Sequence, residues 1–233
     1  TNRYVVEVGP GAFYEQEIDL TGKPYVSIVG SNIQTTEIFP TGSNQNIIKI
    51  GINNELSFLS LTDAPVGYAA LLADDIGDFG QCHKISFYNC DTNIKVIART
   101  QDTQFYGEYI DFNGTYSYGA YVSGSNGFYA LVNLENYYQF PSGSPNLIAN
   151  EAIGTSRLDL RAAVFQGEGE VNGSVSLRLS DGANTEGTSL DIQDWDTGIQ
   201  VLNSGNSSSF DIVGSMIHGS MTYDFDILHP NAN

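Results

Sequence analysis

The sequence is poor in basic residues, and this shortage excludes several classes of partner. It has 9 Lys and Arg against 27 Asp and Glu, for a formal net charge of −18. Nucleic-acid binding depends on clustered Lys and Arg that neutralise phosphates, and attraction to an anionic membrane surface depends on the same side chains. No basic cluster occurs in the chain. We therefore expect no nucleic-acid partner and no membrane-surface binding, and the acidity helps to keep the protein soluble.

Metal-binding and disulfide-forming residues are also scarce. Cys82 and Cys90 are the only cysteines, and the three histidines, His83, His218 and His229, are scattered. A small domain framed by disulfides is excluded, and no Cys/His spacing typical of a metal site exists. The sequence does not determine the redox state of the two cysteines.

Long apolar runs and helical periodicity are missing as well. No run of 18 apolar residues occurs and no signal-peptide-like apolar region is present, so we expect no membrane insertion. The best candidate for a helix is Asn150–Arg161, which Gly154 and Thr155 weaken. At most one short capping helix is expected.

Uncharged polar and aromatic residues take the place of charge. Charged residues make up only 15% of the chain, below the roughly 25% of an average globular protein. The chain has 25 Gly, 14 Tyr and 12 Phe, together with many Asn, Ser and Thr. Such residues suit tight turns and stacked strands better than helices.

Two segments of the chain repeat one pattern. Lys84–Ala98 and Thr188–Asn203 each hold two short alternating runs around a polar turn, and their residues correspond in one register: Ile85 with Leu190, Phe87 with Ile192, Cys90 with Trp195, Asp91 with Asp196, and Val96 with Val201. Ser209–Phe225 is a looser third copy. Repetition of one supersecondary unit predicts a stacked architecture.

Strand-like runs restart throughout the chain at intervals of 20 to 32 residues. These intervals fit single coils of a solenoid, and we predict an all-β parallel solenoid of about eight coils. The alternative is an antiparallel jelly roll or β-sandwich, which is also built from short strands. No linker divides the chain, so residues 1–233 are interpreted as one domain, a fragment of a longer protein.

The beginning of the chain carries a family resemblance. Residues 6–15 read V-x-V-G-P-G-x-[FY]-x-E, and Val26–Ser31 reads V-S-I-V-G-S. This series resembles the opening of right-handed parallel β-helix proteins of the pectin-lyase-like type, which include pectin-degrading enzymes and tailspike-like proteins of phages and large viruses. The resemblance implies a right-handed helix of parallel strands and is specific for fold rather than activity.

Asp74, Asp75 and Asp78 form the densest acidic group. On the fold that the resemblance implies, lyases use clustered acids to bind calcium and glycosidases use paired carboxylates. The motifs that accompany such acids in these enzymes, such as R-I-K or R-x-P-x-x-R, are missing. These residues are weak catalytic candidates, with Glu168 and Glu170 facing them across a groove, and a solvated loop is the alternative interpretation. No cofactor is expected, except calcium under the lyase alternative.

The repeated residues are interpreted as structural. Asp91 and Asp196 occupy equivalent turns, where a carboxylate can accept local backbone N–H groups. Trp195 and Cys90 correspond in the repeat, which favours an inward position for both. Any site is expected where the repeat breaks, in Ala73–Gln81 or in the surface loop predicted over Asn136–Pro145.

Tyrosines concentrate in the middle of the chain and form the candidate ligand surface. Alternating strands cannot bury all of them, and exposed Tyr in a surface of low charge suits contact with glycans or proteins. The candidates for this surface are Tyr116, Tyr118, Tyr121, Tyr137 and Tyr138.

The function predicted from these features is that of a non-enzymatic structural or adhesion β-helix module of a virus or phage particle, spike- or capsid-associated and glycan-binding. The resemblance implies self-association as a homotrimer, with a cell-surface glycan or another virion protein as further partner. The predicted location is the virion or the cell exterior. The alternative is a polysaccharide lyase or glycoside hydrolase on the same fold.

Overall fold

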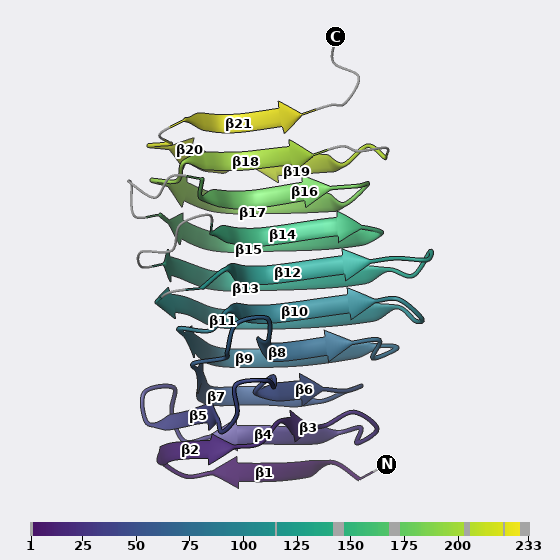
Figure 1. Cartoon of the computed structure of the whole chain (residues 1–233), viewed down its shortest axis with the longest axis vertical. Coiled ribbons are helices and arrows are strands. Elements are labelled where there is room, and N and C mark those ends of the chain that lie inside the picture. The colour runs from purple at the N-terminus through teal and green to yellow at the C-terminus, as the bar shows by residue number, and fades with distance from the viewer. Residues whose placement is uncertain are drawn as a thin grey trace.

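The computed structural model describes residues 2–114, 116–141, 147–167, 173–202, 206–220 and 222–228. All regular structure in these ranges is β-strand. The strands are parallel and stack into a right-handed β-helix of about eight turns (Figure 1), so the predicted solenoid is confirmed and the sandwich alternative is wrong. The described ranges contain no helix long and apolar enough to cross a membrane.

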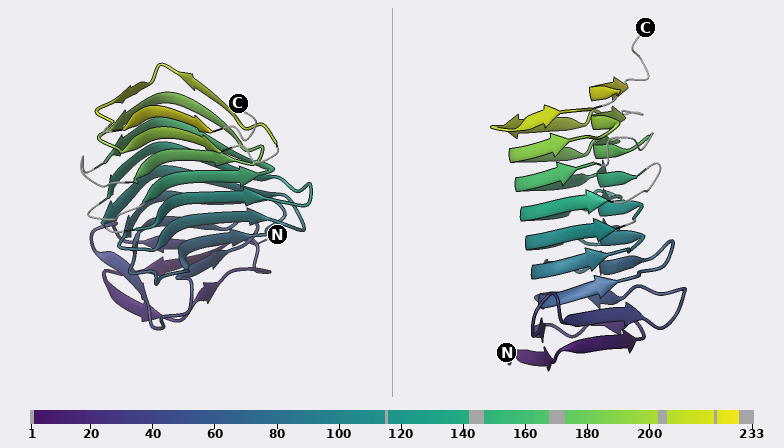
Figure 2. Two further views of the ribbon diagram at one scale, coloured as in Figure 1. Left: turned by 45° about the horizontal axis from the view of Figure 1, so that its top comes forward. Right: turned by 90° about the vertical axis from the view of Figure 1, so that its left-hand side faces the viewer.

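Each turn contributes to two sheets (Figure 2). Sheet A contains β1 (Tyr4–Val8), β2 (Gly11–Glu15), β4 (Val26–Gly30), β5 (Thr36–Pro40), β7 (Glu55–Thr62), β9 (Phe79–Tyr88), β11 (Thr103–Gly114), β13 (Ala130–Pro141), β15 (Ser156–Gln166), β17 (Asn184–Gln193), β19 (Ser209–Val213) and β20 (Met216–His218). Sheet B contains β3 (Ile18–Asp19), β6 (Ile48–Ile50), β8 (Ala69–Asp74), β10 (Thr92–Ala98), β12 (Tyr118–Gly124), β14 (Ile148–Gly154), β16 (Val175–Ser180), β18 (Thr197–Leu202) and β21 (Tyr223–Leu228).

The strand register explains the sequence repeat. From β7 onward, laterally paired residues of sheet A lie 25 to 27 positions apart. Ile85 and Leu190 stand four turns apart, on β9 and β17, and both are buried. The third copy, Ser209–Phe225, was predicted to restart the pattern 20 residues after Leu190, at Phe210, and this register is wrong: Phe210 pairs with Thr185, and Ile192 pairs with Ile217. Alternation alone does not define register, so a shift of a few residues leaves the pattern unchanged.

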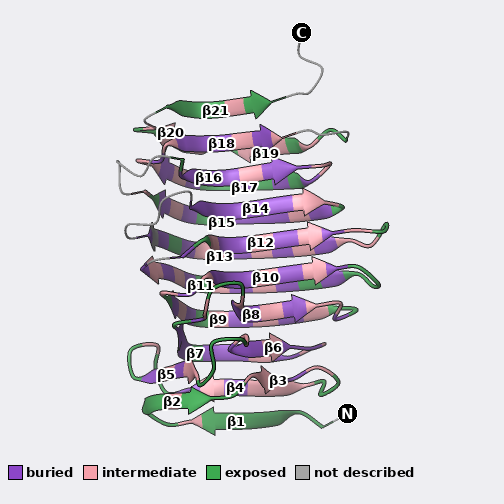
Figure 3. Cartoon of the chain, in the orientation of Figure 1, coloured by how far each residue is buried: buried purple, intermediate pink, exposed green. Residues whose placement is uncertain are grey.

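The core lies between the two sheets (Figure 3). Four neighbouring turns stack the buried rings of Phe87, Phe112, Tyr137 and Phe165 edge to face, with centroids 4.9 to 5.8 Å apart. Trp195 is fully buried and donates from Nε1 to the carbonyl oxygen of Phe165 at 2.9 Å. The inward position predicted for Trp195 is confirmed.

Both cysteines are buried free thiols. Burial raises the pKa of the Cys90 thiol to about 12 and raises that of Cys82 as well. Both therefore stay protonated at neutral pH and act as small apolar residues.

One prediction of local structure is wrong, and the weak helix candidate is strand. Asn150–Arg161 forms the greater part of β14 and the first half of β15, which turn at Gly154 with φ 69°. Lateral pairing to strands on both sides outweighs the weak helical pattern. The loop expected over Asn136–Pro145 is strand as far as Pro141, and residues 142–146 lie outside the described ranges.

Candidate functional site

Asp74 is the last residue of β8, and Asp75 and Asp78 belong to the connection from β8 to β9. Asp74 pairs with the guanidinium of Arg99, one turn further along. Oδ1 of Asp75 accepts hydrogen bonds from the backbone N–H groups of Arg99, at 2.6 Å, and Thr100, at 2.9 Å. Burial acts to raise the pKa of Asp75, but these hydrogen bonds outweigh it and the net pKa is lowered. Asp74 and Asp75 thus hold the connection of the next turn.

The structure gives no further support to an acidic centre at this place. Glu168 and Glu170, expected across the groove, lie outside the described residues. Within the ranges that are described, no group of three or more His, Cys, Asp or Glu side chains is placed to hold a metal ion.

Asp91 and Asp196 perform one function in two turns, but it is not the local cap that the sequence predicted. Each carboxylate reaches both neighbouring turns of the helix. Asp91 accepts from the N–H of Gly67 in the turn before, at 2.9 Å, and from the hydroxyl of Ser117 in the turn after, at 2.6 Å. Asp196 does the same with Gly173, at 2.9 Å, and with Thr222.

The predicted tyrosine surface is only partly right. Tyr116 and Tyr137 are 2% and 0% exposed, so these two belong to the core and were assigned to the surface wrongly. For Tyr137 the reason is the bend at Asn136, which changes which alternate residues of β13 point inward and which the sequence does not show, whereas Tyr116 lies in the connection between β11 and β12. Tyr138 is 43% exposed on sheet A, away from the others. Tyr118 and Tyr121 lie half-buried on the outer face of sheet B.

Tyr121 belongs to a continuous column of ladder-paired residues on the outer face of sheet B. From the N-terminal to the C-terminal end this column reads Lys49, Leu72, Lys95, Tyr121, Glu151, Arg178, Gln200 and Asp226. We call it the sheet B stripe. It holds 3 of the 9 basic residues of the chain.

Side chains of the stripe contact one another across the turns, and Tyr118 packs beside Tyr121 on the same strand, β12. The rings of Tyr118 and Tyr121 meet edge to face with centroids 5.4 Å apart, and Nζ of Lys95 lies 5.5 Å from the Tyr121 ring centroid. Nε of Arg178 donates to Oε1 of Gln200 at 2.8 Å, and Nη1 of Arg178 lies 3.8 Å from Oε1 of Glu151. These contacts hold an aromatic pair beside an oriented guanidinium.

Glu151 is the buried acid of the stripe. It is 6% exposed, and burial raises its pKa although the charge of Arg178 partly opposes the shift. Burial, followed by the negative charge of Glu151, raises the pKa of Tyr118 and Tyr121. Glu151 is therefore a carboxyl group that takes up a proton more readily than an exposed glutamate.

The sequence analysis missed Lys95, Glu151 and Arg178. Each follows an inward residue in a separate turn, and no local motif links them. A signal existed in the 26- to 30-residue spacing from Lys95 through Tyr121 and Glu151 to Arg178, but it can be used only once the pairing of the strands is known.

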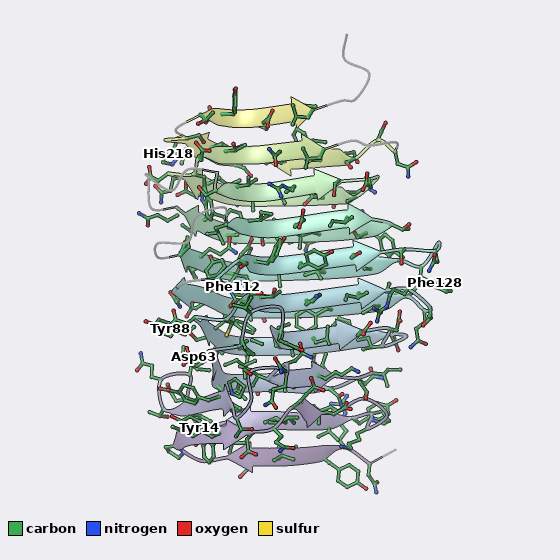
Figure 4. The ribbon with its side chains drawn as sticks, viewed as in Figure 1. Tyr14, Asp63, Tyr88, Phe112, Phe128 and His218 are labelled. Atoms are coloured by element: carbon green, nitrogen blue, oxygen red, sulfur yellow. The ribbon has the colours of Figure 1, made fainter. Side chains whose placement is uncertain are left out.

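Tyr88 and Phe112 illustrate the two environments of an aromatic residue on sheet A (Figure 4). Tyr88 is 49% exposed at the end of β9, whereas Phe112 is fully buried on β11. Aromatic content alone therefore does not define a binding surface.

Comparison with known proteins supports the fold. No protein-family model and no curated protein matches the chain. A solved pectin methylesterase in complex with a hexasaccharide aligns over 99% of this chain and 85% of its own, at 10% identity and a TM-score of 0.50. The resemblance to pectin-lyase-like β-helices is thereby confirmed at the level of fold.

Two further solved structures align at lower scores. A pectin methylesterase from Yersinia enterocolitica aligns over 98% of this chain and 90% of its own, at 11% identity and a TM-score of 0.44. ORF18 of Geobacillus virus E2 aligns over 96% of this chain, at 9% identity and a TM-score of 0.38. This chain spans 54% of the length of that viral protein.

Proposed function

We propose that this β-helix is a structural and adhesion module that holds an anionic glycan against the sheet B stripe. The observation that carries the proposal is the concentration of Lys49, Lys95 and Arg178 beside the Tyr118–Tyr121 pair, on a protein with a net charge of −18. Cations gathered on one face of an acidic protein favour an anionic ligand there, because the rest of the surface repels it.

The chemistry of the stripe suits a sugar polymer. An aromatic ring offers its face to the C–H groups of a sugar, and a guanidinium forms two parallel hydrogen bonds with a carboxylate or sulfate group. Residues of the stripe recur at the strand spacing of about 4.8 Å, which is close to the length of one sugar residue in an extended chain. Successive turns can therefore contact successive sugars.

The test is binding of soluble polygalacturonate and a sulfated glycan, measured by calorimetry at low salt. We expect Arg178→Gln and Tyr121→Ala each to weaken binding by about tenfold, or about 1.4 kcal/mol. Lys23→Gln removes the same unit of charge from an exposed turn at the N-terminal end and serves as the control. The proposal fails if the parent protein binds neither polymer, or if the Lys23 variant loses as much affinity as the Arg178 variant.

The biological setting is a further part of the proposal. We place the module on a virus or phage particle, as a self-associating chain, a homotrimer, that contacts a cell-surface glycan or another virion protein. Support comes from the fold and from the turns rich in uncharged polar residues, which are typical of such modules.

A carbohydrate-active enzyme is the second candidate, and Glu151 is the observation that favours it. A buried carboxyl group with a raised pKa beside an arginine is the environment of a general acid. Incubation with a panel of polysaccharides, with and without calcium, distinguishes the two functions. Release of unsaturated products or reducing ends that disappears in Glu151→Gln would overturn the adhesion proposal, whereas glycans that bind and stay intact would support it.

A further inference from the structure

Sheet A carries a hollow of about 190 Å³ on its outer face, at the N-terminal end of the first long strands. Tyr25 and Phe79 line it together with Arg3 and the polar residues Asn53, Glu55 and Gln81. These residues come from four successive turns, so strand stacking alone brings them together. The hollow is on the other sheet from the sheet B stripe.

Polar groups in the hollow are available to a ligand. Among the residues that the structure describes, no hydrogen bond or ion pair engages the side chains of Asn53, Glu55 or Gln81. Neighbouring Asn54 differs: its side chain accepts from the N–H of Gly51 at 2.7 Å and donates to the carbonyl oxygen of Lys23 at 2.7 Å. Asn54 therefore serves the fold, whereas the other three polar groups face solvent in a recess that holds two aromatic rings.

The backbone that presents the hollow is strained at a bulky residue. Tyr25 has φ 64°, in the left-handed region that favours glycine, and a bulky side chain in this region is an outlier. Such strain persists where the surrounding structure imposes it, and it is concentrated at functional sites. Here it accompanies the placement of the Tyr25 ring at the hollow.

The face continues beyond the hollow along the axis of the β-helix. An uninterrupted column of paired residues runs from Ser27 through Gln81, Tyr106 and Asn133 to Asp211. The rings of Phe79 and Tyr106 stack with centroids 6.4 Å apart. A second hollow, of about 570 Å³, lies at the far end of this column, and its lining includes Tyr129, Phe210, Asn184 and Ser209.

Acidic residues outnumber basic ones on this face, whereas basic residues outnumber acidic ones in the sheet B stripe. Six acids stand on it or at its hollows against three arginines: Glu55, Glu108, Glu135, Asp159, Glu186 and Asp211 against Arg3, Arg157 and Arg161. Two of the arginines are neutralised locally: Arg157 pairs with Asp159 at 2.7 Å and Glu186 at 2.6 Å, and Arg161 pairs with Glu135 at 3.2 Å. Glycans with carboxylate or sulfate groups are repelled here.

We infer that the outer face of the first halves of the sheet A strands is a second glycan-binding groove, specific for uncharged oligosaccharides, with the Tyr25–Phe79 hollow as its primary subsite. The two rings contact the faces of a sugar, and Asn53, Glu55 and Gln81 bond to its hydroxyl groups. This groove does not depend on the sheet B stripe, so an experiment can contradict one of the two proposed sites and leave the other standing.

The experiment uses the full chain with uncharged oligosaccharides of glucose, mannose and N-acetylglucosamine, and saturation-transfer NMR followed by calorimetry. At least one series should bind. Phe79→Ala and Tyr25→Gly should each weaken that binding at least tenfold, whereas the matched control Tyr121→Ala on sheet B should leave it unchanged. For an anionic glycan we expect the reverse: Tyr121→Ala should weaken binding, whereas Phe79→Ala and Tyr25→Gly should leave it unchanged.

Tyr25→Gly keeps the test informative if Phe79→Ala folds poorly. Glycine adopts the positive φ of this position without strain, so the thermal midpoint should not fall below that of the parent. The inference is overturned if no uncharged series binds at millimolar concentration, if Tyr25→Gly binds as the parent does, or if Tyr121→Ala weakens binding equally.

Discussion

One residue in each of six successive turns of sheet A adopts left-handed backbone angles, and three of the six are neither small nor Asn. These residues are Phe58, Lys84, Tyr109, Asn136, Ala162 and Ser189, with φ between 49° and 57°. They form one column at the bend of each strand, where the ladder skips a pair. A left-handed conformation costs an L-residue roughly 1–2 kcal/mol.

Side chains at the bend partly offset this cost. Nζ of Lys84 lies 5.1 Å from the ring centroid of Phe58 and 5.9 Å from that of Tyr109. A cation over an aromatic ring contributes about 0.5–1 kcal/mol at exposed sites. The six residues at the bend share a backbone conformation but differ in side chain, so the bend requires the conformation and not one residue type.

Ala162→Gly should stabilise the protein. Ala162 is exposed with φ 49°, and the relief of strain should exceed the entropy that glycine adds to the unfolded chain, for a net gain of up to about 1 kcal/mol. Thermal or urea unfolding measures it. Ala163→Gly is the matched control and should destabilise, because Ala163 is buried in a regular strand. A loss of stability in Ala162→Gly would contradict the strain argument.

Glu151 should make the stability of the protein fall as pH rises above about 4.5. Burial raises its pKa above the ordinary value of 4.5, so the folded state binds the proton more tightly than the unfolded chain does. The resulting stability is fully present below the unfolded pKa and is lost as pH rises through the folded pKa. From about pH 4 to pH 8, the thermal midpoint of the parent should fall relative to that of Glu151→Gln. A constant difference between the two midpoints over this pH range would contradict the prediction.

At the scale of strands and turns, acidic residues tie each coil to the next. Asp91 and Asp196 each connect three turns, and Asp75 connects two. Backbone hydrogen bonds join successive turns along the strands and also at the connections, where the N–H of Asp91 donates to the carbonyl oxygen of Ala64 and the N–H of Ser117 donates to the carbonyl oxygen of Asp91. Carboxylates supply further acceptors at those connections, and a hydrogen bond to a charged group contributes about 1.5–3 kcal/mol.

Asp91→Ala should lower the free energy of unfolding by about 2 kcal/mol, because the N–H of Gly67 and the hydroxyl of Ser117 lose their acceptor. Urea unfolding gives the value. Asp78→Ala is the comparison: Asp78 is an exposed acid, and no described residue bonds to its side chain, so its loss should change stability by less than about 0.5 kcal/mol. Equal effects of the two substitutions would show that the hydrogen bonds of Asp91 to the neighbouring turns do not stabilise the protein.

At the scale of the whole molecule, the two ends of the β-helix expose apolar strands. Val5 and Val6 on β1 are 60% and 49% exposed, and Phe225 and Ile227 on β21 are 48% and 59% exposed. Among the described strands, β1 and β21 each stand at the end of their sheet with a partner on one side. Unpaired edges with apolar side chains favour association of chains.

Light scattering with size-exclusion chromatography tests how the chain associates. A homotrimer predicts three times the chain mass of 25.2 kDa with little dependence on concentration. Contact through the strand edges at the ends predicts a mass that rises with concentration and falls in Val5→Lys, because a lysine on an edge strand blocks further pairing. A lateral trimer is insensitive to that substitution, so the variant separates the two modes.

Local features of the sequence were sufficient to predict the class of fold. Alternating apolar residues, turn-forming Gly and Asn, and the repeat shared by Ile85 and Leu190 are local features, and they also placed Trp195 correctly in the core. Local patterns suffice because every turn of a solenoid contacts only its neighbours. Asn150–Arg161, the best helix candidate of the sequence, is strand because pairing with strands of the neighbouring turns outweighs its weak helical pattern.

Which polar residues meet depends on the pairing of strands, and no local feature of the sequence defines that pairing. Lys95, Tyr121, Glu151 and Arg178 lie on four separate turns and become one stripe through strand register. Register depends on the length of every connection, and a slip of one residue moves a side chain to the opposite face of its sheet. Tyrosines of the same stretch of sequence therefore lie in different environments. Tyr116 and Tyr137 are buried in the core, whereas Tyr118 and Tyr121 are partly exposed on the outer face of sheet B.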